Sequence, residues 1–401
     1  MKKYPCRKEH NPTNKESYGK KESCCGCSAC VQRCPQKCIT MEADSEGFLY
    51  PVINRAECIH CGLCEKVCPM EINSLEEYTM SAFAVKNPNT TERKQSSSGG
   101  VFISLAKQIL AENGVVFGAV FDKEWTVKHT YTECLDGIYP MMGSKYLQSR
   151  IDNCYQEAET FLKQDRKVLF VGSPCQIKGL RLFLQKDYEN LLAVDFLCHG
   201  VPSPGIWLGY LRESIAPHTL ADVSSISFRD KSTGWNSYSL RISGKDGQPL
   251  LYQRANSNPF MRGFLSDIYL RPACFQCQFK NGKSNSDLTI GDLWGADKIV
   301  PNFYDTLGVG IVILRSKKGE ETFHSSLQLD KILISEEQAK HYNTGFNSSI
   351  QPHLKRNMFF KLMHKDMEVS QAVKKCLTIS FWERWKQKIK LIISKLTTEN
   401  K

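Results

Sequence analysis

The chain has 401 residues, of which 41% are hydrophobic and 24% charged, as in a globular protein with room for two or three domains. No apolar run is long enough to span a bilayer, and the N-terminal stretch MKKYPCRKEHNPTNKE lacks the apolar segment of a signal peptide, so we expect a cytoplasmic location. The net charge of +11 lies at the ends, +5 in residues 1–21 and +6 in residues 374–401. The neutral body therefore argues against a nucleic-acid partner.

The chain contains 18 cysteines, which in a reducing cytoplasm favour metal ligation over disulfides. After a basic tail over residues 1–20, the stretch CCGCSACVQRCP begins at Cys24, and CIHCGLCEKVCP begins at Cys58. Both contain the spacing C-x2-C-x2-C-x3-C followed by proline, which is typical of two-cluster bacterial ferredoxins. We therefore expect a two-cluster ferredoxin domain over residues 21–76.

In such ferredoxins the fourth cysteine of each motif ligates the other cluster. The first [4Fe-4S] cluster is therefore assigned Cys24, Cys27, Cys30 and Cys68, and the second Cys34, Cys58, Cys61 and Cys64. A pair of zinc knuckles is the alternative, but zinc sites need neither the doubled pattern nor the two prolines. Cys25 and Cys38 are left over and are interpreted as structural residues.

The body of the chain begins with a short predicted strand at residues 81–85, followed by the stretch SSSGGVFISLAKQILAENG. Val101, Leu105 and Ile109 mark one face of a helix. Residues 96–100 therefore precede a helix N-terminus, where free N–H groups and the helix dipole attract an anion. A plain serine N-cap is the alternative interpretation.

Three apolar stretches follow with helical segments between them: Val115–Phe121, Lys167–Cys175 and Leu191–Gly200. This alternation predicts an α/β sheet that is covered on both faces. In such sheets ligands bind beyond the carboxyl ends of the strands, and Cys175 and Cys198 lie just past two of those ends.

A lone CxxC pair, Cys274 and Cys277, supplies only two of the four ligands that a thiolate metal site needs. Cys175 and Cys198 are the candidate partners, because four cysteines from three loops at one edge of the sheet would hold a third cluster. Free buried cysteines and a zinc site remain alternatives.

The pattern changes after Ser224, where alternating residues broken at Gly244–Gly247 predict an antiparallel hairpin. The stretch DLTIGDLWGAD is then expected to form a strand and a turn, in which Asp292 and Asp297 either line a substrate mouth or cap turns.

The C-terminal stretch FWERWKQKIKLIISKL is expected to form a basic amphipathic helix. Its apolar residues fall within an arc of about 120° on a helix: Phe381, Trp382, Trp385, Ile389, Ile392, Ile393 and Leu396. Such a helix either makes peripheral contact with an anionic membrane or packs on protein.

Six stretches occur in the order SSSGGVF, GSKYLQS, FVGSPCQIKGL, DFLCHGVPS, YLRPACFQCQF and TIGDLWG. Together they resemble the coenzyme F-420 hydrogenase/dehydrogenase beta-subunit family, in the version with an N-terminal two-cluster ferredoxin domain. The resemblance implies an FAD- and iron–sulfur-binding catalytic domain over residues 80–300, followed by a C-terminal extension over residues 301–401. The expected architecture is an α+β ferredoxin-type module, then an α/β flavoprotein domain with an added antiparallel β region, then helices.

The family's cluster ligands carry over to Cys175, Cys198, Cys274 and Cys277. The resemblance also favours flavin phosphates at the helix N-terminus, and the flavin-binding residues that carry over are Ser97, Ser98, Gly99, Gly100, Ser144, Lys145, Gly172 and Ser173. His199, beside Cys198, is a candidate catalytic proton relay, with a structural histidine as the alternative.

We therefore expect an iron–sulfur flavoprotein oxidoreductase that passes electrons through [4Fe-4S] clusters to or from FAD and a two-electron substrate. That substrate is either a deazaflavin coenzyme or an intermediate of a polysaccharide pathway, and ferredoxin or another redox protein is the expected donor or acceptor. The alternative is a non-catalytic electron-relay subunit that serves a partner enzyme.

Overall fold

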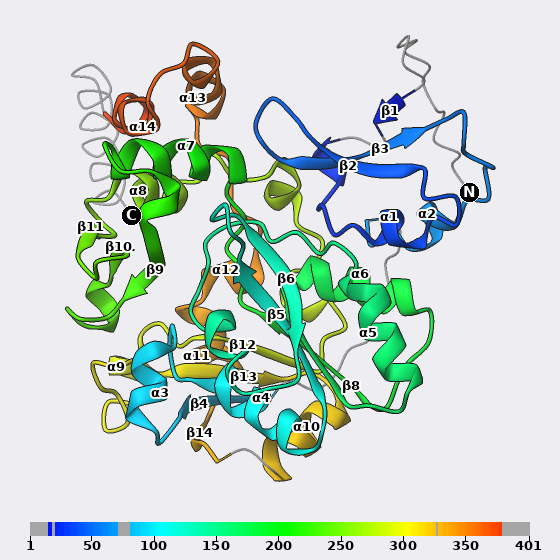
Figure 1. The fold of residues 1–401 in the computed structure, drawn as a ribbon. Helices are drawn as coiled ribbons and strands as arrows, with labels where there is room; N and C mark the ends of the chain where they lie inside the picture. The colour runs from blue at the N-terminus through cyan, green and yellow to red at the C-terminus, as the bar shows by residue number, and fades with distance from the viewer. Residues whose placement is uncertain (1–14, 18–20, 71–80, 326–327, 379–401) are drawn as a thin grey trace, which may run out of the picture.

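The computed structural model describes residues 15–17, 21–70, 81–325 and 328–378 (Figure 1). The predicted amphipathic helix after residue 380 and the predicted end of the ferredoxin domain lie outside the described residues. Within these ranges no helix has the length and hydropathy needed to cross a membrane.

The N-terminal module is a three-stranded antiparallel sheet with two short helices, and its strand order is β1-β3-β2 (Figure 1). The elements are β1 (Lys15–Ser17), α1 (Ala29–Arg33), β2 (Ile39–Ala43), β3 (Leu49–Asn54) and α2 (Leu63–Lys66). One helix follows the start of each cysteine motif. Ser28 before α1 and Gly62 before α2 both have positive φ, 60° and 71°, so the two motifs turn the chain in the same way.

The body is built on an eight-stranded mixed sheet of order β14-β4-β13-β12-β8-β7-β5-β6. Its strands are β4 (Ser81–Lys86), β5 (Val115–Phe121), β6 (Val127–Thr132), β7 (Val168–Gly172), β8 (Leu191–Phe196), β12 (Leu288–Asp292), β13 (Gly310–Leu314) and β14 (Asp330–Ile334). The four strands β5, β7, β8 and β12 are parallel, and every other pairing is antiparallel.

Helices cover both faces of this sheet, as the near-continuous apolar strands predict. Val168 and Phe170 point to the face that carries α5 (Cys154–Lys163) and α6 (Pro174–Leu184), whereas Leu169 packs with α4 (Val101–Ala111) on the other face. The remaining helices of this region are α3 (Thr90–Gln95), α9 (Ala296–Ile299), α10 (Lys317–Ser325), α11 (Glu336–His341) and α12 (Thr344–Asn347).

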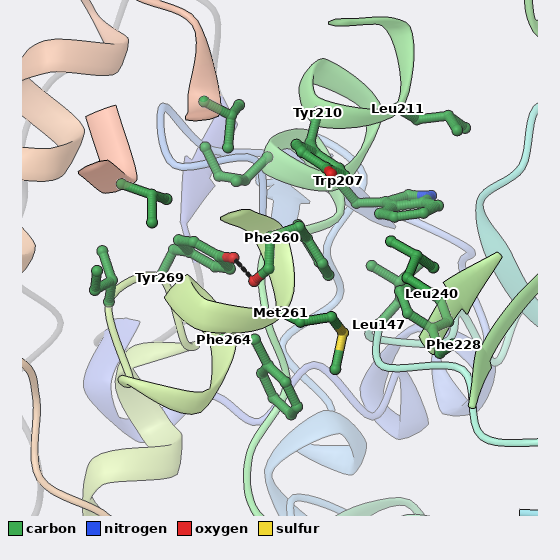
Figure 2. Close-up of a cluster of buried hydrophobic side chains, with 14 of the residues drawn as sticks. Leu147, Trp207, Tyr210, Leu211, Phe228, Leu240, Phe260, Met261, Phe264 and Tyr269 are labelled. Atoms are coloured by element: carbon green, nitrogen blue, oxygen red, sulfur yellow. Dashed lines mark hydrogen bonds between the residues drawn. The ribbon is translucent and has the colours of Figure 1, made fainter. Parts of the chain in front are cut away.

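A separate antiparallel sheet of order β11-β10-β9 contains the predicted hairpin. Its elements and the helices against it are α7 (Pro204–Ile215), β9 (Val223–Asp230), β10 (Ser239–Gly244), β11 (Pro249–Arg254), α8 (Pro259–Leu265), α13 (Arg356–Met363) and α14 (Val369–Leu377). Trp207 is at the centre of their shared core (Figure 2), with ring centroids 4.8 Å from Phe228 and 5.0 Å from Phe260.

The central sheet continues beyond residue 300, where the sequence analysis placed a helical extension. All five residues of β13 are buried, and the strand lies between β4 and β12, while β14 pairs with the other side of β4. The sequence did not reveal this because β13 and β4 pair across more than 200 residues of chain. The expected helices are also present in this region, as α10, α11, α12, α13 and α14, but the strands β13 and β14 stand on either side of α10.

Candidate functional site

A cavity of about 470 Å³ lies at the carboxyl ends of β7, β8 and β12, a size typical of small-molecule sites. It brings together every residue that was expected to bind the flavin, the four cysteines of the expected third cluster and His199. Its lining includes Ser97, Ser98, Gly99, Gly100, Ser144, Lys145, Gly172, Ser173, Cys175, Cys198, His199, Cys274 and Cys277.

The N-terminal end of α4 lines this cavity, and no side chain caps it. The N-cap is Gly100, with φ 81°, and no side chain accepts from the first N–H groups. The alternative of a plain serine N-cap is therefore wrong, and Ser98 instead donates to the carbonyl of Val309 at 2.9 Å. A Cβ on Gly99 would lie 2.4 Å from the Val85 carbonyl oxygen, so close packing requires glycine there.

Ser144 and Lys145 shape the wall beside this helix end. The backbone N–H and the hydroxyl of Ser144 both donate to Ser97 Oγ, at 2.5 and 2.8 Å. Lys145 Nζ donates to the carbonyls of Met141, Met142 and Gly143. Burial lowers the pKa of Lys145 to about 7, because the charged amine is removed from water.

Local sequence places Cys175 in the first turn of α6. Ser173 is the N-cap and exchanges hydrogen bonds with Gln176 in a capping box, with Pro174 at the first helical position. The Ser173 hydroxyl lies 3.2 Å from Cys175 Sγ. The strand β7 ends at Gly172, so this turn delivers the thiol to the edge of the sheet.

We call Cys175, Cys198, Cys274 and Cys277 the body group. The thiol of Cys198 interacts electrostatically with the other three, and burial raises its pKa well above the ordinary value. Burial likewise raises the pKa of Cys274 to about 12. Four thiols around one cavity match the donor set of an iron–sulfur cluster. In the described chain no three His, Cys, Asp or Glu side chains meet as ligands of a single metal ion.

The module holds two further sets of cysteines, which we call the inner group (Cys24, Cys27, Cys30 and Cys68) and the outer group (Cys34, Cys58, Cys61 and Cys64). In the inner group the thiol of Cys30 interacts with those of Cys24 and Cys68, and that of Cys27 with Cys30 and Cys68. In the outer group three members, Cys34, Cys58 and Cys64, pack around the small core of Cys38, Ile39 and Ile53. Cys30 of the inner group packs against the same core and interacts with Cys64, so the two groups are neighbours, and their assignment to separate clusters stays a prediction.

Cys25, interpreted from sequence as merely structural, lies between the inner group and the body group. Its thiol packs in one core with Cys27 and Cys175 and interacts electrostatically with both, and it also lines the cavity. Gln148 fixes this segment by donating to the Cys25 carbonyl at 3.0 Å. Sequence reasoning missed this position because the motif spacing assigns Cys25 no ligand role.

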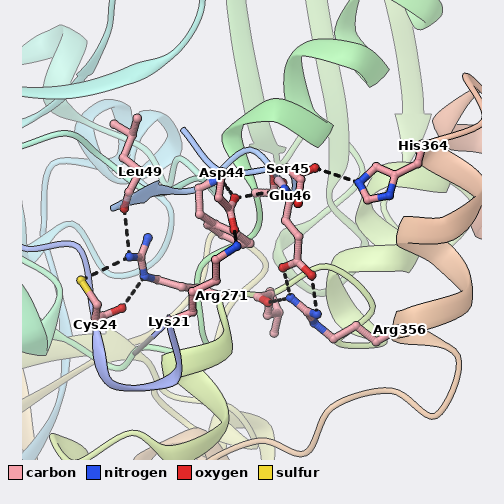
Figure 3. A network of polar contacts seen from close by, with 12 residues as sticks. Lys21, Cys24, Asp44, Ser45, Glu46, Leu49, Arg271, Arg356 and His364 are labelled. Atoms are coloured by element: carbon pink, nitrogen blue, oxygen red, sulfur yellow. Dashed lines mark hydrogen bonds and ion pairs between the residues drawn. The ribbon is translucent and has the colours of Figure 1, made fainter. Parts of the chain in front are cut away.

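Arg271 is a second residue that the sequence analysis missed (Figure 3). It immediately precedes the turn Pro272–Gln276 that carries Cys274, and its side chain contacts Cys24 of the module. Its place in the stretch YLRPACFQCQF next to the CxxC pair was the available signal.

His199 and Asp292 both line the cavity, and each is hydrogen-bonded to a neighbouring side chain. His199 Nε2 lies 2.6 Å from Asp267 Oδ1. Asp292 pairs with Arg229 at 2.5 Å and accepts from Trp235 Nε1 at 3.1 Å. Asp297, the other candidate for a substrate mouth, is not among the lining residues.

Two models of known protein families match separate parts of the chain. Residues 165–340 match the family model that describes the C terminus of the beta subunit of coenzyme F420 hydrogenase/dehydrogenase, and residues 23–72 match the 4Fe-4S dicluster domain. All eight cysteines of the inner and outer groups lie within the second match.

Two curated relatives match over 317 residues each. The F subunit of the F(420)H(2) dehydrogenase of Methanosarcina mazei is 22% identical, over 75% of this chain and 81% of that protein. The coenzyme F420-dependent sulfite reductase of Methanocaldococcus jannaschii is 23% identical, over 74% of this chain but only 45% of that protein.

Among solved structures, a chain of the xenon-derivatized F420-reducing [NiFe] hydrogenase complex from Methanosarcina barkeri is 16% identical, with a TM-score of 0.44. The similarity covers 75% of this chain and 94% of that one. The family matches identify an iron–sulfur protein of an oxidoreductase family. Residues 165–340 thus belong to the family of the C terminus of the coenzyme F420 hydrogenase/dehydrogenase beta subunit, and they follow an N-terminal 4Fe-4S dicluster domain.

Proposed function

We propose that this protein is an iron–sulfur flavoprotein oxidoreductase that links a one-electron donor or acceptor to a two-electron substrate. The inner, outer and body groups each hold one [4Fe-4S] cluster, and FAD occupies the cavity beside the body group. When bound, clusters transfer single electrons and FAD exchanges electrons singly or in pairs. The protein supplies the order of the sites, their burial and the groups that hold them.

The observation that carries this proposal is the contact through Cys25. Cys25 and Cys27 of the module pack in one core with Cys175 of the body group, and the thiol of Cys25 interacts electrostatically with the other two. Gly179 of α6 packs against Cys27 so closely that a Cβ would lie 3.0 Å from Cys27 Sγ. The module therefore has its inner cysteines in direct contact with the body, as an electron route between the two requires.

The cavity fits a flavin at two places. The uncapped N-terminus of α4 offers N–H groups and the positive end of the helix dipole to the phosphates. Ser97, Ser144 and Lys145 lie beside this end, while Gly172 and Ser173 lie at the start of α6, next to the body group. A flavin that spans these two places would reach from the anion site to the cysteines.

His199 is proposed to relay a proton at the cavity. Its ring lines the cavity while Asp267 holds Nε2. A carboxylate on one ring nitrogen fixes the tautomer and the orientation of the ring, so the other nitrogen is left to accept or give a proton. The edge of the Phe264 ring, with a centroid distance of 5.4 Å, restricts how the imidazole turns.

The two curated relatives are named for the deazaflavin coenzyme F420, which supports that coenzyme as the two-electron substrate here. One of them is a dehydrogenase subunit, which supports a place for this chain in a larger complex. The second candidate function is a relay subunit without its own substrate. The name of the same relative favours it as well, because that protein is one subunit of a dehydrogenase. Flavin content separates the two candidates, because a relay needs no flavin.

The test is anaerobic purification with cluster reconstitution, followed by iron, sulfide and flavin analysis of the full chain. We expect about 12 iron and one non-covalent FAD per chain. Reduced ferredoxin and reduced coenzyme F420 are then offered separately, and flavin absorbance is followed. Clusters without flavin would leave the relay function, and zinc without labile sulfide would overturn the proposal.

A further inference from the structure

One buried arginine connects the inner group with the body group. Arg271 is 0% exposed, and its backbone carbonyl accepts from the N–H of Cys274 at 2.9 Å. Its side chain extends into the module, where Nε donates to the Cys24 carbonyl at 2.7 Å and Nη2 lies 3.6 Å from Cys24 Sγ (Figure 3). The same residue therefore contacts a proposed ligand from each group.

The remaining neighbours of this guanidinium carry no charge. Nη1 donates to Gln148 Oε1 at 2.8 Å, Nη2 donates to the Leu49 carbonyl at 2.9 Å, and the ring of Tyr50 lies 4.2 Å away. In the described part of the chain no carboxylate forms an ion pair with Arg271. Three other largely buried arginines do have such partners, in the pairs Arg93–Asp305, Arg229–Asp292 and Arg356–Glu46.

A buried cation without a counter-charge is strongly unfavourable, and an arginine does not escape by losing its proton. Among the described residues, the titratable groups that interact with Arg271 are the phenol of Tyr50 and three cysteine thiols. Cys24 is in contact with it, and Cys25 and Cys274 interact with it electrostatically. An iron–sulfur cluster on four thiolates supplies the missing counter-charge.

We propose that Arg271 is the counter-charge of the inner cluster and raises the affinity of that cluster for its electron. This inference rests on the proposed function. Each electron that the donor gives up adds one negative charge beside the guanidinium, and the low dielectric of a buried site makes that attraction strong. Hydrogen bonds to the sulfurs, net charge and burial are the factors that set cluster potentials. Arg271 is thus a positioning residue for electron transfer between module and body.

The test compares Arg271→Gln with Arg271→Lys in the full chain with reconstituted clusters. Iron is counted first, and the inner cluster is then followed by electron paramagnetic resonance during a reductive titration. We expect Arg271→Gln to keep about 12 iron but to bind the electron about tenfold more weakly, which is about 59 mV for a one-electron couple. Arg271→Lys keeps the charge and should stay near the wild-type potential.

Arg356→Gln is the matched control. Arg356 also joins the body to the module, through a bidentate ion pair with Glu46, but it contacts no cysteine in the described structure. It should leave the potential unchanged. If Arg356→Gln shifts the potential as far as Arg271→Gln, docking of the module is the cause and the inference is overturned.

Gln148→Glu decides the case in which the Arg271 variants lose the inner cluster. It places a carboxylate next to Nη1 and offsets the charge of the guanidinium while the arginine is kept, although it also removes the bond from Gln148 to the Cys25 carbonyl. The potential should fall in the same direction as in Arg271→Gln, and an unchanged potential overturns the inference alone. Wild-type protein without reducible clusters would overturn the proposed function as well, so the two failures are distinguishable.

Discussion

The two cysteine motifs of the module have the same spacing and the same local turn, yet opposite surroundings. In the first motif every residue from Cys25 to Ala29 is buried. In the second, residues 59–61 are all exposed, and Ile59 keeps 59% of its surface accessible. The two motifs therefore have equivalent local geometry, and the packing of the first motif against the body makes their burial different.

Because of this difference in burial, the outer group faces solvent and the inner group faces the body. The outer group includes the exposed Cys61, where a redox partner is able to approach, whereas the inner group touches the body through Cys27 and Cys24. Exposure and nearby charge are among the factors that set a cluster's potential. Two identical motifs are thus expected to differ in access and in potential.

The largest expected effect comes from removing one ligand of each group in turn. Cys27→Ala and Cys61→Ala should each lose about four of about 12 iron. Cys27→Ala should abolish delivery of electrons from a reduced viologen to the flavin, because it removes the link to the body. Cys61→Ala should largely preserve it, since a small donor still reaches the inner group. Stopped-flow absorbance at the flavin band measures both rates, and equal rates would remove the distinction between the groups.

The next largest effect is expected from removing a ligand of the body group. Cys274→Ala should lower iron from about 12 to about 8 per chain while both module clusters remain reducible, because the module folds around its own eight thiolates. Flavin reduction by one-electron donors should be much slower. Cys175→Ala and Cys198→Ala should behave alike.

Cys154→Ala and Cys376→Ala are the controls for that experiment, because both cysteines are buried and have no proposed ligand role. Their iron content should equal that of the wild type. Full iron in Cys274→Ala together with loss in Cys175→Ala would mean that the four cysteines do not share one site.

The smallest effect is expected at the far end of the route, where both module groups are untouched. Ser144→Asp places a negative charge beside the uncapped end of α4, whereas Ser144→Asn has nearly the same size without charge. Iron should be unchanged in both. The aspartate should weaken FAD binding about tenfold, or about 1.4 kcal/mol, relative to the asparagine. Flavin fluorescence titration measures this, and equal affinities would place the phosphates elsewhere.

Local pattern accounts for much of what the sequence predicted. The strands β5, β7 and β8 follow from apolar runs that are covered on both faces, and the turn at Ser173 follows from its capping residues. The edge of the sheet where the cavity lies follows from parallel strand direction. Each of these depends on neighbours within a few residues or on a general rule of sheet topology.

Long-range pairing accounts for what was missed. The bonds from Arg271 to Cys24 join residues 247 positions apart, and Gln148 reaches Cys25 across 123 positions. The strand β13 lies between β4 and β12, although the sequence analysis had ended the domain before it. No periodicity or motif spacing carries such information.

By itself, the sequence predicted the eight module cysteines as cluster ligands, the CxxC pair with its candidate partners, and a helix N-terminus after residues 96–100. These depend on spacing and on local backbone geometry, which a short segment carries with it. Only the tertiary structure decided that the first motif is buried and the second exposed, and that Cys25 and Arg271 lie between the inner group and the body group. The reason is physical: burial and counter-charge are properties of surfaces brought together from distant parts of the chain, and identical motifs acquire different environments only when those surfaces meet.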